Sequence, residues 1–328
     1  MANGHNQGEG KRTLRGTERF RRAVCMFSFT LAVWPLSRAL AYQRPNFTPG
    51  FNLFSPPEDV AVGHKASAQM DHSLPLVQDP VVVQYINSLG KYLSQFAPNQ
   101  KTFKYPWTFH VVNSDAINAF ALPGGYIYVN RGAIVAAQDE AELAGVLAHE
   151  EGHVVMRHGT HEASERLLAD MPLEILAGYL GQNSSLLGQL TELGIGLGVN
   201  SLFLKNSRDV ETQADRVGTY ILYRSGYDPY AMAQFFKIIQ EKYPERTLEF
   251  FSDHPDPGNR IEAVDEEVPE LGPAKAWKTD SPEFEAIKQR LLAMPPPPKS
   301  QGAHGGAGAA LPPGGNRPIL TNLREEKN

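Results

Sequence analysis

The sequence predicts an α+β fold that is mainly helical and contains one small antiparallel sheet. Apolar residues recur at helical spacing over residues 58–100, 139–158 and 207–223. Residues 107–129 alternate between apolar and polar positions and are rich in β-forming side chains. The chain has 328 residues, of which 41% are hydrophobic, and this is enough to form a sizeable core. We therefore predict one main domain over residues 58–292.

The first 41 residues have the three parts of a secretory signal peptide. Six basic residues lie among the first 22, against two acidic ones, and Ala23–Pro35 is apolar and uncharged. Ala39-Leu40-Ala41 then has the small side chains of a signal-peptidase site. We predict cleavage before Tyr42 and export to a bacterial periplasm, with no transmembrane span in the mature chain. The alternative is an uncleaved anchor, but the apolar run is shorter than the roughly 20 residues that span a bilayer.

The charge and cysteine content of the mature chain exclude two classes of function. Removing residues 1–41 takes away seven basic and two acidic residues, a net +5, and changes the formal charge from −5 to −10. Such an acidic chain argues against nucleic acid as a partner. Cys25 is the single cysteine, so the mature chain has no disulfide and no cysteine nucleophile or metal ligand. Export without disulfides fits a periplasm.

The segment before the first strands is expected to supply packing, not chemistry. Residues 42–57 are rich in Pro, Asn and Phe and are expected to form an extended lead-in. Helical spacing follows over residues 58–100, and Asp79-Pro80 marks the start of a second helix, because proline suits a first helical turn.

Three short strands are predicted before the next helix. Trp107–Val112 and Ala116–Leu122 are followed by the turn Pro123-Gly124-Gly125 and by Tyr126–Val129. The strands are expected to form the small antiparallel sheet. One of them is either an edge strand that pairs with an extended substrate or part of a scaffold, and the pattern alone does not choose between these.

Residues 139–158 are predicted to form one helix, buried on one side, that can hold a metal ion. Three acidic residues lie at its start, where the helix dipole favours them. His149 and His153 are four residues apart, so their imidazoles lie one turn apart on the same face. Glu150 follows the first histidine, as in the H-E-x-x-H pattern of zinc peptidases, where the glutamate takes a proton from water. The alternative is a structural helix whose histidines hydrogen-bond to backbone carbonyls.

A second candidate helix, residues 207–223, carries two acidic residues at the same spacing. Glu211 and Asp215 share one face, so Glu211 can complete a metal site while Asp215 accepts a hydrogen bond from a ligand histidine. Between the two helices, residues 162–205 are apolar and glycine-rich. We expect that segment to be a core helix pair or a cover over the site in preference to a membrane-facing surface.

The C-terminal third contains one block of chemical interest. A core helix is predicted to begin at Asp228-Pro229, and a last amphipathic helix over Pro282–Leu292. Between them, Ser252–Ile261 is a proline-stiffened turn that leads into a helix. Residues 266–280 are expected to be a linker. Residues 293–328 are rich in Pro and Gly and are expected to be disordered.

With these blocks assembled, the chain resembles the zinc metalloprotease family that includes the CAAX prenyl protease, HtpX and the β-barrel assembly-enhancing protease, a branch of the gluzincins. The four blocks, in family order, cover roughly residues 58–265 and together are highly specific. They are Asn118–Gly125, Leu143–His153, Ser207-Arg208 with Glu211 and Asp215, and His254-Pro255 with Arg260-Ile261.

The resemblance implies a zincin-like domain with one zinc ion per chain. It implies His149, His153 and Glu211 as zinc ligands, Glu150 as general base and acid, and Asp215 as support for a ligand. It also implies that the strand near residues 126–130 lines the substrate cleft. The strand residues assigned to substrate binding are Gly125, Tyr126, Ile127, Tyr128 and Val129.

Three further residues have open roles. His254 either stabilises the oxyanion or occupies the open position of the zinc and holds the enzyme inactive, the alternative being a structural turn. Arg260 pairs with an acidic partner or contacts the reacting carbonyl. Glu151 departs from the family pattern, which has an uncharged residue there. Successive helical residues point about 100° apart, so Glu151 either faces away from the metal or faces the site and alters the charge felt by the bound water.

The sequence therefore predicts an exported zinc metalloendopeptidase that hydrolyses peptide bonds of misfolded or misassembled envelope proteins. Its expected partners are unfolded protein substrates and possible outer-membrane assembly machinery, not nucleic acid. The alternative is a chaperone-like outer-membrane assembly factor with a self-blocked zinc site and little proteolysis.

Overall fold

The computed structural model describes most of the predicted domain. All described residues belong to the unit Tyr42–Asn328. The predicted signal peptide, most of the glycine-rich segment and most of the predicted tail lie outside them, and the domain boundaries stay a prediction. The described residues are 46–98, 103–170, 207–244, 250, 253–254 and 260–297.

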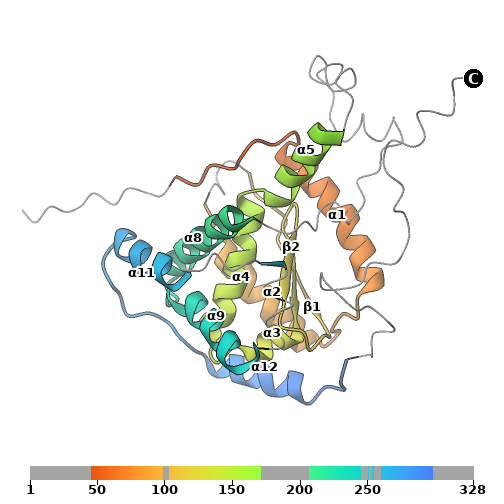
Figure 1. Ribbon diagram of the computed structural model, residues 1–328. Coiled ribbons are helices and arrows are strands. Elements are labelled where there is room, and N and C mark those ends of the chain that lie inside the picture. The colour runs from red at the N-terminus through yellow and green to blue at the C-terminus, as the bar shows by residue number, and fades with distance from the viewer. Residues whose placement is uncertain are drawn as a thin grey trace, which may run out of the picture. The chain divides into compact units, whose positions relative to one another are not determined.

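A central helix, α4 (Glu140–Val155), organises the fold, and every one of its residues is buried. The Asp139 side chain caps it by accepting a hydrogen bond from the backbone of Glu142 at 2.9 Å. Helices α8 (Arg208–Ser225) and α9 (Ala231–Lys242) pack along α4 (Figure 1).

The prediction of one helix to residue 158, buried on one side, was wrong in two respects. Helix α4 ends at Val155, and Arg157 then takes a left-handed conformation with φ 59° before α5 (His158–Asp170) begins. The helix is buried on all sides because α2 (Pro80–Ser94) and the sheet also contact it.

The sheet is mixed and not antiparallel as predicted. Its strands are β1 (Thr108–Val112), β2 (Ala119–Leu122) and β3 (Tyr126–Asn130), in the order β1-β3-β2. β3 pairs antiparallel with β2, through the tight turn at Gly124 and Gly125, and parallel with β1. β3 lies between β1 and β2. Because the hairpin reverses the chain after β2, β3 runs antiparallel to β2 and in the same direction as β1.

Two hydrophobic clusters hold these layers together. The larger surrounds α4, α2 and α9, and the smaller lies between the sheet, α1 (Pro56–Ser73) and α5. Helix α1 therefore lies on the side of the sheet opposite α4 (Figure 1). The lead-in contributes Phe54 to the smaller cluster, and the Asn52 side chain donates to Thr160 Oγ1 of α5 at 2.8 Å.

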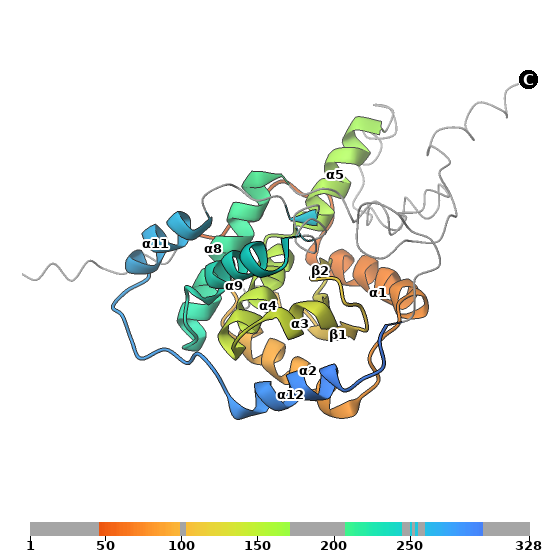
Figure 2. The same ribbon diagram turned by 60° about the horizontal axis from the view of Figure 1, so that its bottom comes forward.

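Three shorter helices complete the described part of the chain. α3 (Arg131–Ala136) follows β3, and α12 (Pro282–Leu292) packs against α2 and α3 (Figure 2). α12 has its predicted bounds. Helix α11 (Arg260–Glu270) runs into the predicted linker because Val264 and Val268, one turn apart, are buried. No helix among the described residues is long and apolar enough to cross a membrane.

Candidate metal centre

Two glycines allow α4 and α8 to approach closely. A Cβ atom on Gly152 would lie 2.7 Å from the backbone oxygen of Ala214, and one on Gly218 would lie 3.2 Å from the backbone nitrogen of His149. Both distances are tighter than ordinary van der Waals contact. The short separation brings the acidic residues of α8 to the histidines of α4.

Four buried side chains converge where these helices meet. The Nε2 atoms of the two α4 histidines are 3.0 Å apart. The carboxylate of Glu211 faces both, with Oε2 3.3 Å from His149 Nε2 and Oε1 3.4 Å from His153 Nε2. The fold thus brings the three predicted metal ligands together and adds a fourth group. The ligand atoms that lie within 4.8 Å of one another belong to His149, His153, Glu211 and His254.

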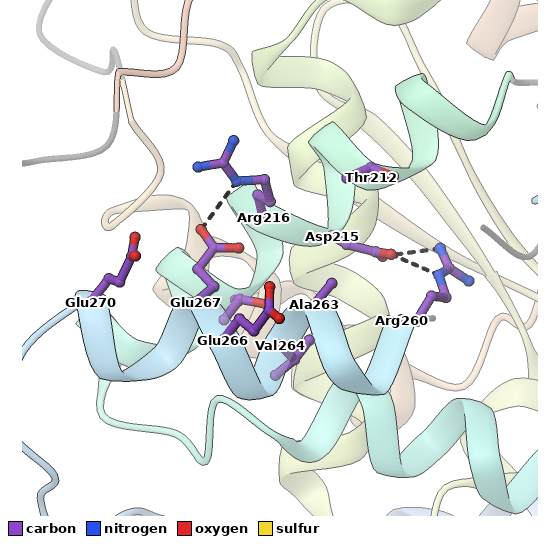
Figure 3. Close-up of a pocket in the computed structure, with 10 residues that line it drawn as sticks. Thr212, Asp215, Arg216, Arg260, Ala263, Val264, Glu266, Glu267 and Glu270 are labelled. Atoms are coloured by element: carbon purple, nitrogen blue, oxygen red, sulfur yellow. Dashed lines mark hydrogen bonds and ion pairs between the residues drawn. The ribbon is translucent and has the colours of Figure 1, made fainter. Parts of the chain in front are cut away.

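Asp215 and Arg260 support this cluster from behind. Asp215 Oδ1 lies 2.9 Å from His149 Nδ1. Arg260 reaches Asp215 from α11 with Nε at 2.7 Å and Nη2 at 2.9 Å (Figure 3), and Nη2 also donates to Glu211 at 3.0 Å. The guanidinium stacks over the Phe236 ring at 3.9 Å. Arg260 therefore binds acidic partners that in turn hold the ligand cluster.

The pocket drawn in Figure 3 lies beside this ion pair, between α8 and α11. Glu266, Glu267 and Glu270 of α11 line it together with Arg216 of α8. Arg216 Nε pairs with Glu267 at 3.5 Å. That pair joins α8 to α11, and none of these residues is among the described ligand atoms that converge.

The electrostatics of the cluster fit a cation. Asp215 accepts a hydrogen bond from Nδ1 of His149, so the other ring nitrogen, Nε2, faces the centre of the ligand cluster. Burial raises the pKa of Glu211, but His254, His153 and His149 outweigh it and hold the pKa well below its ordinary value. Burial lowers the pKa of His149, but hydrogen bonds to Asp215 and Glu211 outweigh it and raise that pKa to about 9, so a positive charge is favoured among these ligand atoms.

Glu150 is buried beside the cluster and lies close to His254. It is 1% exposed, and its Oε1 lies 3.6 Å from His254 Nε2. Within the described part of the chain this oxygen has no hydrogen-bond partner.

Glu151, the residue that departs from the family pattern, is fully buried. It is absent from the converging group of described ligand atoms. Neither of its carboxylate oxygens has a hydrogen-bond partner among the described residues, and burial raises its pKa well above the ordinary value. Burial therefore favours the protonated form of Glu151, which lowers the negative charge beside Glu150.

His254 reaches the cluster from outside α4 and α8. Its Nδ1 lies 3.3 Å from Glu211 Oε2 and 3.3 Å from His149 Nε2. Its Nε2 lies 3.1 Å from the backbone oxygen of Ala119, on the edge of β2 that faces away from β3. The ring also stacks on Phe250, with centroids 4.9 Å apart.

The strand predicted to bind substrate is not an edge strand. The residues from Gly125 to Val129 belong to β3 and its preceding turn, and β3 is paired on both sides. A strand with both neighbours in place has no free backbone groups for a substrate. The edge strand next to the ligand cluster is β2, which lies between β3 and His254.

His158 is a site residue that the sequence reasoning missed. It is 4% exposed, and its Nδ1 lies 3.0 Å from Nδ1 of His153. A continuous helix would place a residue five positions after His153 about 140° away around the axis. Only the break at Arg157 brings it back, and spacing alone does not reveal that break.

A comparison with known protein families agrees with this geometry. Residues 84–268, more than half of the chain, match Peptidase family M48. The chain belongs to peptidase family M48. This confirms the resemblance to the zinc metalloprotease family, whose motif carries the two histidines of α4.

Named relatives are about one-third identical to this chain over the residues that align. The "Beta-barrel assembly-enhancing protease" of Yersinia pestis is 32% identical over 242 residues, 72% of this chain and 49% of the relative. The protein of that name from Escherichia coli strain K12 is 32% identical over 243 residues, with the same coverage. The "Mitochondrial metalloendopeptidase OMA1" of Schizosaccharomyces pombe is 32% identical over 166 residues, 50% of this chain and 47% of the relative. The chain spans about half the length of the curated relatives it matches.

Proposed function

We propose that this protein is a zinc metalloendopeptidase that hydrolyses misfolded or misassembled envelope proteins after export to the periplasm. The observation that carries the proposal is the buried convergence of His149, His153 and Glu211, with Glu150 alongside. Membership of a peptidase family supports peptide hydrolysis, and the name of the bacterial relatives supports a role in β-barrel assembly.

The donor set fits zinc. Two imidazole nitrogens and one carboxylate oxygen are the protein ligands of catalytic zinc in one group of peptidases, and they leave one position for water or substrate. When bound, zinc polarises a carbonyl and lowers the pKa of water. We infer one ion per chain, held by His149, His153 and Glu211.

Glu150 carries the proton. Its Oε1, which has no hydrogen-bond partner among the described residues, accepts a proton from the attacking water, whose oxygen forms the new bond to the scissile carbonyl carbon. As the carbon–nitrogen bond breaks, Glu150 returns the proton to the leaving amine. Because the carboxylate is buried beside the cluster, this transfer takes place away from bulk water.

The outer edge of β2 is the proposed binding place for the substrate backbone. Ala119 presents its carbonyl there, and by alternation Ala121 presents its backbone groups on the same edge. Strand addition holds a peptide mainly through its main chain, so it suits clients of varied sequence.

His254 supports a restrained form of the enzyme. Its Nδ1 stands among the ligand atoms, while its Nε2 takes the Ala119 carbonyl that an added strand would use. One side chain thus competes with both water at the metal and substrate at the edge. We infer that a client must displace His254 before hydrolysis begins.

The test compares mature wild type with Glu150→Gln and His254→Ala. We expect one zinc per chain in all three by elemental analysis. Hydrolysis of an unfolded casein substrate should fall by at least about 100-fold in Glu150→Gln, as expected when a general base is lost, and rise in His254→Ala.

The outcomes separate the two functions. Zinc without hydrolysis in any form, including His254→Ala, would favour a client-binding assembly factor over a protease. Absence of zinc from wild-type protein prepared with the metal would overturn the metal centre itself. A cellular rescue assay adds a second criterion, because Glu150→Gln should fail to restore a peptidase function.

A further inference from the structure

The two ligand histidines have different partners on their far nitrogens. His149 Nδ1 faces the carboxylate of Asp215 at 2.9 Å. His153 Nδ1 faces another imidazole, that of His158, at 3.0 Å. The nitrogen of His158 therefore stands where a carboxylate or carbonyl oxygen usually orients a ligand histidine.

The two rings form a hydrogen bond whose direction follows from the nitrogen that His153 turns toward the metal site. One nitrogen must carry a hydrogen and the other a lone pair. His153 Nε2 points to the ligand cluster, 3.4 Å from Glu211 Oε1. A neutral imidazole that offers Nε2 to a metal carries its hydrogen on Nδ1, so His153 donates and His158 Nδ1 accepts.

The second nitrogen of His158 completes the arrangement. With Nδ1 as acceptor, the ring carries its hydrogen on Nε2. That atom lies 3.5 Å from Oε1 of Gln213, a long contact to an acceptor on α8 between Glu211 and Asp215. Helix α8, which provides Glu211 as a ligand, therefore also contacts His158 through Gln213.

The position of His158 depends on the break between α4 and α5. Arg157 has φ 59°, and its side chain holds Asp59 of α1 through bonds of 2.6 and 2.9 Å. The left-handed residue reverses the path of the chain, so that His158, the first residue of α5, faces back to His153. Both rings are buried, which keeps water from competing for the hydrogen bond.

We propose that His158 is a positioning residue that holds His153 in its metal-binding tautomer and orientation through the Nδ1–Nδ1 hydrogen bond. The inference rests on the proposed zinc site. His158 touches neither substrate nor metal, and it acts only through His153. Its loss should weaken metal binding more than it weakens the fold.

The test uses three substitutions at this position with different acceptor placement. Asn carries its oxygen on Cγ, the atom that bears Nδ1 in histidine, so His158→Asn should keep the acceptor. Gln carries its oxygen one bond farther out, and Leu has no acceptor. His161→Asn, on the more exposed part of α5, is the matched control because its ring contacts the backbone of Phe51 and no ligand.

The readouts are zinc affinity by chelator competition and the absorption spectrum of the cobalt(II)-substituted protein. We expect affinity to fall about 10- to 100-fold in His158→Leu and His158→Gln. It should stay near wild type in His158→Asn and His161→Asn. The cobalt bands should change in the first pair only. Thermal unfolding of the metal-free proteins identifies any variant that fails to fold.

The outcomes distinguish this inference from the proposed function. A wild-type protein that binds one zinc, together with a folded His158→Leu of unchanged affinity and unchanged cobalt spectrum, would overturn the role of His158 alone. Equal losses in His158→Asn and His158→Leu would also overturn it, because the acceptor would then be irrelevant. A wild type without zinc would overturn both.

Discussion

The charged residues around the metal centre form a connected set. Arg260 contacts two carboxylates of α8, those of Glu211, a predicted ligand, and of Asp215, the partner of His149. The guanidinium therefore offsets negative charge on two buried carboxylates. Burying such charges without partners would cost several kcal/mol each.

Replacing Arg260 by Lys tests whether the arginine acts on the metal site or on the substrate. Lysine keeps the charge but cannot bond two carboxylates in a fixed plane. We expect zinc affinity to fall about tenfold, measured by chelator competition, because Asp215 and Glu211 lose their shared support.

A different result would change the role of Arg260. Unchanged zinc affinity with a large loss of kcat for casein hydrolysis would show that the guanidinium contacts the reacting carbonyl. Arg216→Lys, at the neighbouring pair with Glu267, is the matched control and should leave zinc affinity unchanged.

At the scale of elements, the junction between α4 and α5 is held by contacts from α1. Arg157 is the one residue other than glycine with positive φ among the described residues. Its ion pair with Asp59 and its bond to the backbone of Phe54 hold that conformation. A helix end at the metal site thus depends on residues about 100 positions earlier in the chain.

Substitutions at Arg157 should separate the ion pair from the backbone conformation. Arg157→Ala and Arg157→Gly both remove the partner of buried Asp59, and each should lose about 3 kcal/mol of unfolding free energy. The Gly variant should be more stable than the Ala variant by about 1 kcal/mol, because glycine adopts positive φ without strain. Urea unfolding of both variants measures the difference, and an Ala variant as stable as Gly would contradict a left-handed residue 157.

The first turn of α4 makes stability depend on pH. Burial raises the pKa of Glu142 to about 7, from an ordinary value of 4.5, although its Oε2 accepts a 2.7 Å bond from the backbone of Gln138. Between these two pH values the unfolded chain ionises Glu142 while the folded chain keeps it protonated. Stability from this group is therefore lost as pH rises from 4.5 to about 7 and is constant above that.

Glu142→Gln should remove that loss. Glutamine keeps an acceptor for the Gln138 amide and does not ionise. We expect equal stability of variant and wild type near pH 4.5, and a more stable variant at pH 8 by about 1–3 kcal/mol. Urea unfolding at both pH values measures this, and an advantage present only at low pH would contradict the sign.

At the scale of the whole molecule, local patterns predicted the helices and much of the site. α2 begins after its Asp79 cap, and α12 has its predicted bounds, because propensity, proline and capping agree there. His149 and His153 share one helix, so their spacing alone placed them together. Glu211 lies on a second helix, where its spacing from Asp215 made it a candidate ligand and the resemblance then assigned it to the metal site.

The rest depended on contacts distant in the sequence. The break has arginine and not glycine at its left-handed position, residue 157, and is held by Asp59. The parallel β1–β3 pairing depends on which strand fills the centre of the sheet, and alternation does not encode that. His158 became a candidate only after the break had turned it toward His153.

Removal of the metal should affect the stability of the whole domain, because the ligands come from α4 and α8, and His254 joins them from a third segment. Zinc that binds only the folded chain stabilises it by about 4 kcal/mol when free zinc is 1,000 times Kd. For a domain of this size that corresponds to a rise in Tm on the order of 10 °C. Calorimetry with added zinc and with a chelator measures the shift. Glu211→Ala, which lacks one ligand, should lose most of the response, and an equal shift in both proteins would place the metal elsewhere.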